Sequence, residues 1–205
     1  MEADFWNERY GGDAGYFYGI EPNSFLASVA AQIPPGPVLC LAEGEGRNAV
    51  HLASLGHAVT AVDQSTAGLA KAQRLAANRG VPLTTVAADL AVYPIEAARW
   101  TGIVSIFAHL PQPLRRNVHA AVVHGLRPGG VFILEAYTPA QLAFGTGGPK
   151  DPALLMRLED LRHELAGLEL IVAQETEREV REGSGHTGRA AVVQIVGRRA
   201  APTLA

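Results

Sequence analysis

Apolar runs alternate with amphipathic segments through the middle of the chain. Five apolar runs each predict a buried strand, at residues 38–42, 58–62, 83–87, 102–107 and 131–135. The amphipathic segments between them predict helices at residues 46–55, 66–79 and 112–126. Because strands that alternate with helices of about 10–15 residues are typical of a parallel sheet, we predict helices on both faces of such a sheet.

The two ends of the chain follow other patterns. Residues 1–33 predict two short helices around an aromatic, glycine-rich loop, and residues 152–166 predict one further helix. Two strand-like runs, 168–180 and 190–198, are joined by a glycine-rich link and predict an antiparallel hairpin. The fold class predicted is therefore α/β, in three layers, with a mostly parallel seven-stranded sheet and a C-terminal antiparallel hairpin.

Composition narrows the classes of function. The 205 residues fit one domain, and a net charge of −3 provides no basic field to attract nucleic acid. No apolar run approaches the ~20 residues of a membrane span, and the N-terminus has no apolar signal core. The one cysteine, Cys40, suits a reducing compartment and is expected to be a small buried core residue. We expect a cytoplasmic protein with no nucleic-acid or membrane partner.

The most informative motif joins the first predicted strand to the first predicted helix. Gly44 and Gly46 allow the backbone to turn sharply, and the helix that follows points free amide groups at the turn. The turn also carries two carboxylates, Glu43 and Glu45, which would repel a pyrophosphate and attract a cation. S-adenosylmethionine has a ribose, an adenine, a sulfonium and an ammonium but no phosphate, so these charges favour it. The glycine spacing taken alone also fits a dinucleotide site, or a turn that binds nothing.

Acidic residues follow the next two predicted strands. Asp63 stands 17 residues after Gly46, where a carboxylate can accept both hydroxyls of a ribose. Its alternative role is a helix N-cap, for which Ser65 competes. Asp89 can accept from the exocyclic amine of adenine while the backbone of Leu90 contacts the ring. The alternative for Asp89 is a turn aspartate bonded to its own backbone.

Together these motifs resemble the class I S-adenosylmethionine-dependent methyltransferases. The resemblance is carried by the turn at 38–49, by Asp63 and Asp89, and by Leu126-Arg127-Pro128-Gly129-Gly130. Three further segments resemble the small bacterial methyltransferases of the tellurite-resistance-like group, and they are Trp6–Tyr10, Tyr18–Asn23 and Phe107–Pro111.

The resemblance implies a Rossmann-like fold with S-adenosylmethionine as the cofactor. It divides the single domain into three parts: an N-terminal helical lid at 1–33, a cofactor-binding core at 38–135, and an acceptor-side helix and hairpin at 136–200.

The resemblance also implies a set of cofactor-binding residues. The family places an acid where this chain has Cys40, so we expect Glu43 or Glu45 to partner the ammonium of the cofactor instead. Tyr18 would cover the sulfonium with an aromatic face, and Arg9 would pair with the cofactor carboxylate. The alternative for both residues is that they only pack the N-terminal segment on the sheet. The complete set is Arg9, Tyr18, Glu43, Gly44, Glu45, Gly46, Asp63, Gln64, Asp89 and Leu90.

Three residues are candidates for positioning a methyl acceptor. His109 follows the fourth predicted strand and either orients or deprotonates the acceptor, or serves the structure only. His186 and Arg189, on the hairpin, either hold an anionic acceptor or are ordinary surface residues. The other histidines have no metal-ligand spacing and are expected on surfaces: His51, His57, His119, His124 and His163.

The function expected is methyl transfer to a soft or anionic small-molecule acceptor by a monomer or weak homodimer. Two alternatives stay open. One is an NAD(P)-dependent oxidoreductase, which the glycine turn alone would also fit. The other is a relative that binds the cofactor without catalysis.

Overall fold

The computed structural model describes residues 3–12 and 15–201. Within that part of the chain, seven strands form one sheet in the order β3-β2-β1-β4-β5-β7-β6. The first five strands pair in parallel, whereas β7 pairs antiparallel with both β5 and β6. The predicted fold class is confirmed. The strands are β1 (Pro37–Leu41), β2 (Ala58–Asp63), β3 (Thr84–Ala87), β4 (Trp100–Ile106), β5 (Leu126–Tyr137), β6 (Leu168–Glu182) and β7 (His186–Arg199).

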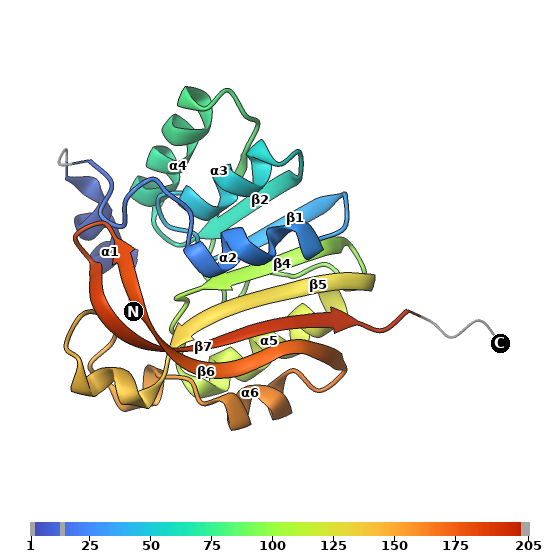
Figure 1. Cartoon of the computed structure of the whole chain (residues 1–205). Coiled ribbons are helices and arrows are strands. Elements are labelled where there is room, and N and C mark those ends of the chain that lie inside the picture. The colour runs from blue at the N-terminus through green and yellow to red at the C-terminus, as the bar shows by residue number, and fades with distance from the viewer. Residues whose placement is uncertain (1–2, 13–14, 202–205) are drawn as a thin grey trace.

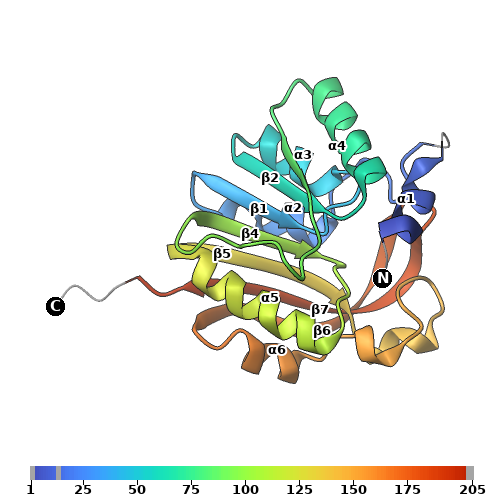
Figure 2. The ribbon, with the colours of Figure 1, turned by 180° about the vertical axis from the view of Figure 1, so that it is seen from behind.

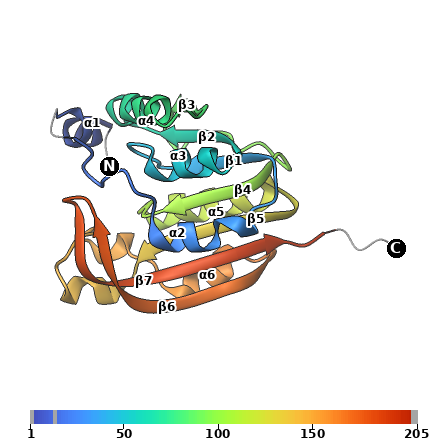
Figure 3. The ribbon, with the colours of Figure 1, turned by 45° about the horizontal axis from the view of Figure 1, so that its top comes forward.

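Helices cover both faces of the sheet, because both faces of these strands are apolar (Figures 1 and 2). The core on one face includes side chains from α2, α3 and α4, and α2 lies over β5 (Figure 3). The core on the other face includes side chains from α5 and α6. The helices are α1 (Ala3–Gly11), α2 (Ser24–Val29), α3 (Arg47–Ser54), α4 (Thr66–Asn78), α5 (Gln112–Gly125) and α6 (Leu158–Glu164). None of the helices described here is long and apolar enough to cross a bilayer.

The topology brings distant segments to one edge of the sheet. The chain leaves β1 toward β2 on one side, and β4 pairs with β1 on the other side. This reversal between β1 and β4 leaves a crevice at the carboxyl ends of the strands, where α/β folds bind ligands. The end of the β6–β7 hairpin rises beside α1 at the same edge (Figure 1). The backbone amide of Ser184 on this hairpin donates to the Phe17 carbonyl at 3.0 Å.

Two predicted elements in the C-terminal part have other bounds in the structure. The helix predicted over 152–166 is wrong in extent: a 3₁₀ turn (Pro152–Leu154) and α6 are separated by extended chain. Leu155 and Met156 are buried there, and the Met156 amide donates to the Tyr137 carbonyl at 2.9 Å, so tertiary contacts outweigh helix propensity. The hairpin strands continue beyond their predicted ends until Glu182 pairs with His186.

His119, which was expected on a helix surface, is instead buried with 3% of its area exposed. Its Nδ1 lies 2.7 Å from Glu164 Oε2, and Arg115 donates to the same carboxylate at 2.7 Å. Although burial raises the pKa of Glu164, the hydrogen bonds from His119 and Arg115 lower it to about 2. This carboxylate therefore ties α5 to α6.

Glu164→Gln is expected to reduce the acid sensitivity of the fold. Because the pKa of Glu164 is lower in the folded chain than its ordinary 4.5, the group stabilises the fold above pH 4.5 and loses this effect as pH falls toward 2. The loss amounts to at most about 3 kcal/mol. Urea unfolding at pH 3 and pH 6 would measure it, with Glu159→Gln, an exposed acid on α6, as the control. Equal acid sensitivity in Glu164→Gln and the parent would contradict the assignment.

Candidate functional site

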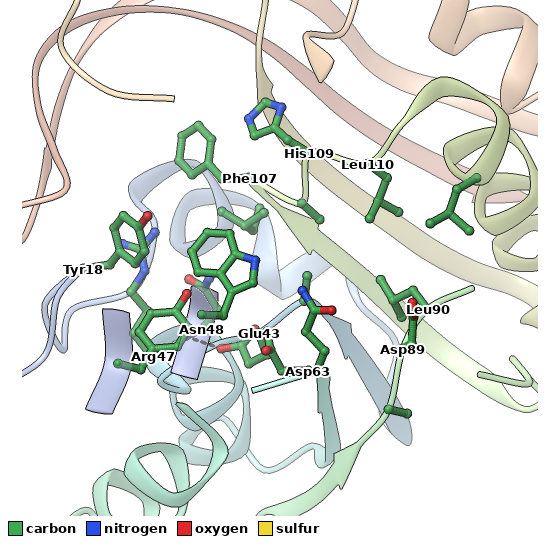
Figure 4. A pocket seen from close by; sticks show the side chains of 18 of the residues that line it. Tyr18, Glu43, Arg47, Asn48, Asp63, Asp89, Leu90, Phe107, His109 and Leu110 are labelled. Atoms are coloured by element: carbon green, nitrogen blue, oxygen red, sulfur yellow. Dashed lines mark hydrogen bonds between the residues drawn. The ribbon is translucent and has the colours of Figure 1, made fainter. Parts of the chain in front are cut away.

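A cavity of about 220 Å³ opens at the carboxyl edge of the sheet. The segments that follow β1, β2, β3 and β4 line it, together with α1 and the hairpin (Figure 4). The structure brings eight of the predicted residues into this lining: Tyr18, Glu43, Asp63, Gln64, Asp89, Leu90, His109 and His186. Five others, within the described chain, do not line it: Arg9, Gly44, Glu45, Gly46 and Arg189.

The turn after β1 has a backbone that suits few residues. Ala42, Gly44 and Gly46 have φ angles of 49°, 61° and 89°, in the left-handed region. A Cβ at Gly46 would stand 2.4 Å from the Cβ of Ala72 on α4. A Cβ at Gly44 would stand 2.8 Å from the hydroxyl of Tyr10. These glycines therefore allow the turn to pack closely against Tyr10 and α4. Their neighbours Glu43 and Arg47 line the cavity.

Glu43 caps the helix that begins after this turn. Its Oε1 accepts from the amides of Asn48 at 3.0 Å and Ala49 at 2.7 Å, near the start of α3. Burial raises the pKa of Glu43 to about 7, opposed by these amide hydrogen bonds and by the nearby charge of Arg47. A carboxyl that titrates near neutrality in a cavity is typical of a functional site.

Asp63, at the end of β2, is 7% exposed and accepts two backbone hydrogen bonds. Its Oδ2 accepts from the Gly44 amide and its Oδ1 from the Ser65 amide, both at 2.8 Å. Burial raises the pKa of Asp63, and the backbone hydrogen bonds oppose that rise. Ser65 caps α4, because its Oγ accepts from the Gly68 amide at 3.0 Å. Asp63 is thus not needed as an N-cap and retains lone pairs for a ligand.

Asp89, after β3, makes a turn interaction and also lines the cavity. Its Oδ1 accepts from the amide of Ala91 at 2.8 Å, which is the turn interaction. The residue also lines the cavity, together with Leu90. The turn fixes the position of the carboxylate at the rim without excluding a ligand contact.

Glu45 and Arg189 do not take the predicted positions. Glu45 Oε1 accepts from Lys71 Nζ at 2.9 Å and its Oε2 from the Phe17 amide at 2.7 Å, so both of its oxygens already have partners outside the cavity lining. Arg189 is exposed on the hairpin and pairs with Glu177. Neither side chain is available to a ligand in the cavity.

Arg9 also lies outside the cavity lining. Its guanidinium stands 4.7 Å from the ring centroid of Phe5 and 5.0 Å from that of Phe17. It also donates to the Tyr18 hydroxyl at 3.3 Å. The predicted pairing of Arg9 with a cofactor carboxylate would require this side chain to move.

Aromatic rings form one wall of the cavity region. The ring centroid of His186 stands 4.5 Å from that of Tyr18, 4.8 Å from that of Phe107 and 5.2 Å from that of Tyr137. The ring of His109 stacks on Tyr137 at 5.6 Å. Tyr18, Phe107, His109 and His186 line the cavity, and we call these four with Tyr137 the aromatic wall. Such a wall presents ring faces that suit a cation or an apolar ligand.

Burial disfavours the charged form of both histidines of the wall. Burial lowers the pKa of His109 to about 4, and its Nδ1 lies 2.9 Å from the carbonyl of Leu154. Burial also lowers the pKa of His186, opposed by Glu182, whose Oε2 lies 3.5 Å from its Nδ1. His186 is 7% exposed, so of the two alternatives for this residue the ordinary surface position is excluded.

A buried polar network behind the wall was not found from the sequence. Asn23 Nδ2 donates to Glu135 Oε2 at 2.5 Å and to Glu182 Oε1 at 2.9 Å. Arg178 binds both oxygens of Glu135, and Arg47 donates to Glu182 Oε2 at 2.6 Å. The sequence offered one sign of this network, which was the charged Arg47 inside the glycine motif. The partners could not be identified from the sequence, because they come from distant segments. Within the described residues, no cluster of three potential metal ligands occurs.

A family model matches part of the chain in sequence, and solved structures match the chain in fold. Residues 38–130 match the sequence model of a family described as a methyltransferase domain. No curated protein matches the chain in sequence. TehB from Haemophilus influenzae is 19% identical, with a TM-score of 0.72 over 96% of this chain and 66% of that chain. N-methyltransferase NodS from Bradyrhizobium japonicum WM9, in complex with S-adenosyl-L-homocysteine, is 13% identical, with a TM-score of 0.70 over 98% of each chain.

A third similar structure comes from work on the conversion of a disulfide bond into a thioacetal group during echinomycin biosynthesis. It is 20% identical, with a TM-score of 0.80 over 100% of this chain and 94% of that chain. At these identities the solved structures show the fold. The match at 38–130 confirms, for that segment, the resemblance to methyltransferases that the sequence indicated.

The carboxyl of Glu43 is expected to titrate near pH 7 in the ligand-free protein, because burial disfavours its charged form. Carbon-13 NMR of labelled glutamate side chains would follow it, and Glu43→Gln would assign the signal. A midpoint near 4.5, the ordinary value, would show that the carboxyl is better solvated than the structure indicates.

Proposed function

We propose that this chain binds S-adenosylmethionine in the cavity and transfers its methyl group to a small-molecule acceptor. The methyltransferase family match and the fold shared with the S-adenosyl-L-homocysteine complex of NodS support the choice of cofactor. The donor set of the cavity supports it independently, because the carboxylates and aromatic rings suit a ligand that carries positive charge.

The observation that carries the proposal is the charge of the cavity lining. Glu43, Asp63 and Asp89 place three carboxylates there. Among the described lining residues, Arg47 is the one arginine or lysine, and Glu182 balances its charge at 2.6 Å. A cavity with this balance favours a cation over an anion.

The residues fit the parts of this cofactor. Asp63 would hold the ribose hydroxyls, while Asp89 and Leu90 would hold the adenine beside Gln64. Glu43 would hold the ammonium, and the ring faces of the aromatic wall would surround the sulfonium. We propose Glu43 alone for the ammonium, because Glu45 is bound to Lys71 and Phe17.

A dinucleotide fits this site less well for a specific reason. A pyrophosphate at a glycine turn requires free amides at the start of the following helix. Here the amides of Asn48 and Ala49 already donate to Glu43. A phosphate would have to displace this carboxylate while remaining beside it, so the oxidoreductase alternative is disfavoured.

The cofactor supplies a methyl group that is already activated for attack by a nucleophile. The chain's own residues then orient the acceptor and exclude water, and alignment alone contributes about 7–11 kcal/mol in favourable cases. His109 is a weak base, because its pKa lies at about 4. With Arg189 outside the lining and Arg47 neutralised by Glu182, we infer that the acceptor is soft and uncharged rather than anionic.

Asp63→Ala is expected to weaken the binding of S-adenosyl-L-homocysteine by about 2–3 kcal/mol, roughly 30- to 150-fold in Kd, because charge-assisted hydrogen bonds to the ribose are lost. Isothermal titration calorimetry measures this, with Glu169→Ala, an exposed acid on β6, as the control. The thermal unfolding of each variant checks that the turn after β1 is intact. Unchanged affinity in folded Asp63→Ala would contradict the ribose contact.

Methyl transfer itself is tested with labelled S-adenosylmethionine and fractionated cell metabolites. We expect label in small, uncharged molecules with a sulfur or similarly soft nucleophile. Cofactor binding without transfer to any fraction would favour a non-catalytic relative instead.

A further inference from the structure

Glu45 stands two residues after Glu43 in the turn between β1 and α3, with 4% of its area exposed. Its Oε2 accepts from the backbone amide of Phe17 at 2.7 Å and from that of Tyr18 at 3.4 Å. The two amides belong to the loop that follows α1. One carboxylate therefore attaches this loop to the turn at which the cofactor is proposed to bind.

Lys71, on α4, completes the attachment. Its Nζ donates to Glu45 Oε1 at 2.9 Å and to the carbonyl of Gly15 at 2.6 Å. Lys71 is 8% exposed, and the hydroxyl of Tyr16 donates to its backbone carbonyl at 3.2 Å. The Glu45–Lys71 pair thus binds backbone groups on both sides of Tyr16.

The hairpin tip contacts the same loop from the other side. The Ser184 amide donates to the Phe17 carbonyl at 3.0 Å. A Cβ at Gly183 would stand 2.2 Å from that carbonyl oxygen, and a Cβ at Gly185 would stand 2.4 Å from Tyr18 Cε1. The glycines of the tip are needed for this close approach, so the loop is held between the cofactor turn and the hairpin.

The residue positioned by these contacts is Tyr18. Its ring lines the cavity and lies 4.5 Å from the ring of His186, on the aromatic wall (Figure 4). A shift of the backbone at Tyr18 would move its ring and open this wall to water. His186 is also held by these contacts, because it begins β7 directly after the tip that binds the loop.

We propose that Glu45 and Lys71 are positioning residues that hold Tyr18 in the wall of the cavity and slow the release of the cofactor product. This inference rests on the proposed function for its ligand, whereas the contacts of the pair do not depend on any ligand. Neither residue touches the cavity, and both act through Tyr18.

The chemistry of the pair makes a sharp variant possible. In Glu45→Gln, the amide oxygen can accept from Phe17 or from Lys71, while the amide nitrogen can only donate. One of the two donors then faces another donor in a buried site, which is costly. Lys71→Met removes the cation and the bond to Gly15 but keeps the Glu45 carboxylate, and it serves as the second variant.

The experiment has two readouts. Hydrogen exchange of the ligand-free protein is expected to quicken at the amides of Phe17, Tyr18 and Ser184 in Glu45→Gln and Lys71→Met. Stopped-flow displacement of S-adenosyl-L-homocysteine is expected to show about tenfold faster release in both variants, the effect of losing one charge-assisted hydrogen bond. Glu21→Gln, which alters an exposed acid on the same N-terminal segment, is expected to leave both measurements unchanged.

Tyr18→Ala separates positioning from general destabilisation. If Glu45 acts through Tyr18, then Glu45→Gln adds no further increase in release rate when the ring is already absent. An equal increase in both backgrounds, or a release rate and exchange unchanged from the parent, would overturn the proposal. If the parent bound no S-adenosyl-L-homocysteine, the proposed function would fail, and the exchange measurement would still decide whether the pair fixes the loop.

Discussion

The site depends on one interaction, the hydrogen bonds from the first free amides of α3 to the carboxylate of Glu43. A helix start after a glycine turn is ordinarily an anion site, because its amides are unpaired and its dipole is positive there. In this chain a side chain of the turn occupies those amides. Glu43 also lines the cavity, so a turn that binds phosphates in other folds here offers a carboxyl group, which suits a cation.

The second constraint is that the walls of the cavity come from opposite ends of the chain. The carboxylate of Glu135, fully buried on β5, binds Arg178 of the hairpin and Asn23 of the N-terminal segment. Asn23 also donates to Glu182, whose carboxylate accepts from Arg47. Removing one partner from such a buried network leaves an uncompensated charge, which costs several kcal/mol. The network therefore fixes the hairpin against the core before any ligand binds.

The fold was predictable because its signals are local. The apolar runs, the glycine turn and the acids after β2 and β3 each depend on residues close in sequence, and the sheet order follows from parallel crossovers. The roles of Glu43 and Glu45 were not separable in this way. They stand two residues apart. Glu43 binds amides of α3, whereas Glu45 binds Lys71 on α4. The burial of His119 was missed, and the two alternatives for His186 stayed open, because their partners Glu164 and Glu182 lie on other elements.

The central claim is that a carboxyl group on the helix amides selects an adenosyl compound with an ammonium group over a diphosphate. Crystals of the protein soaked in parallel with S-adenosyl-L-homocysteine and with NADH test it most directly. The account predicts the homocysteine amino group beside Glu43, the ribose beside Asp63, and no bound NADH. A pyrophosphate on the amides of Asn48 and Ala49, with Glu43 displaced and the cavity closed to S-adenosyl-L-homocysteine, would contradict it.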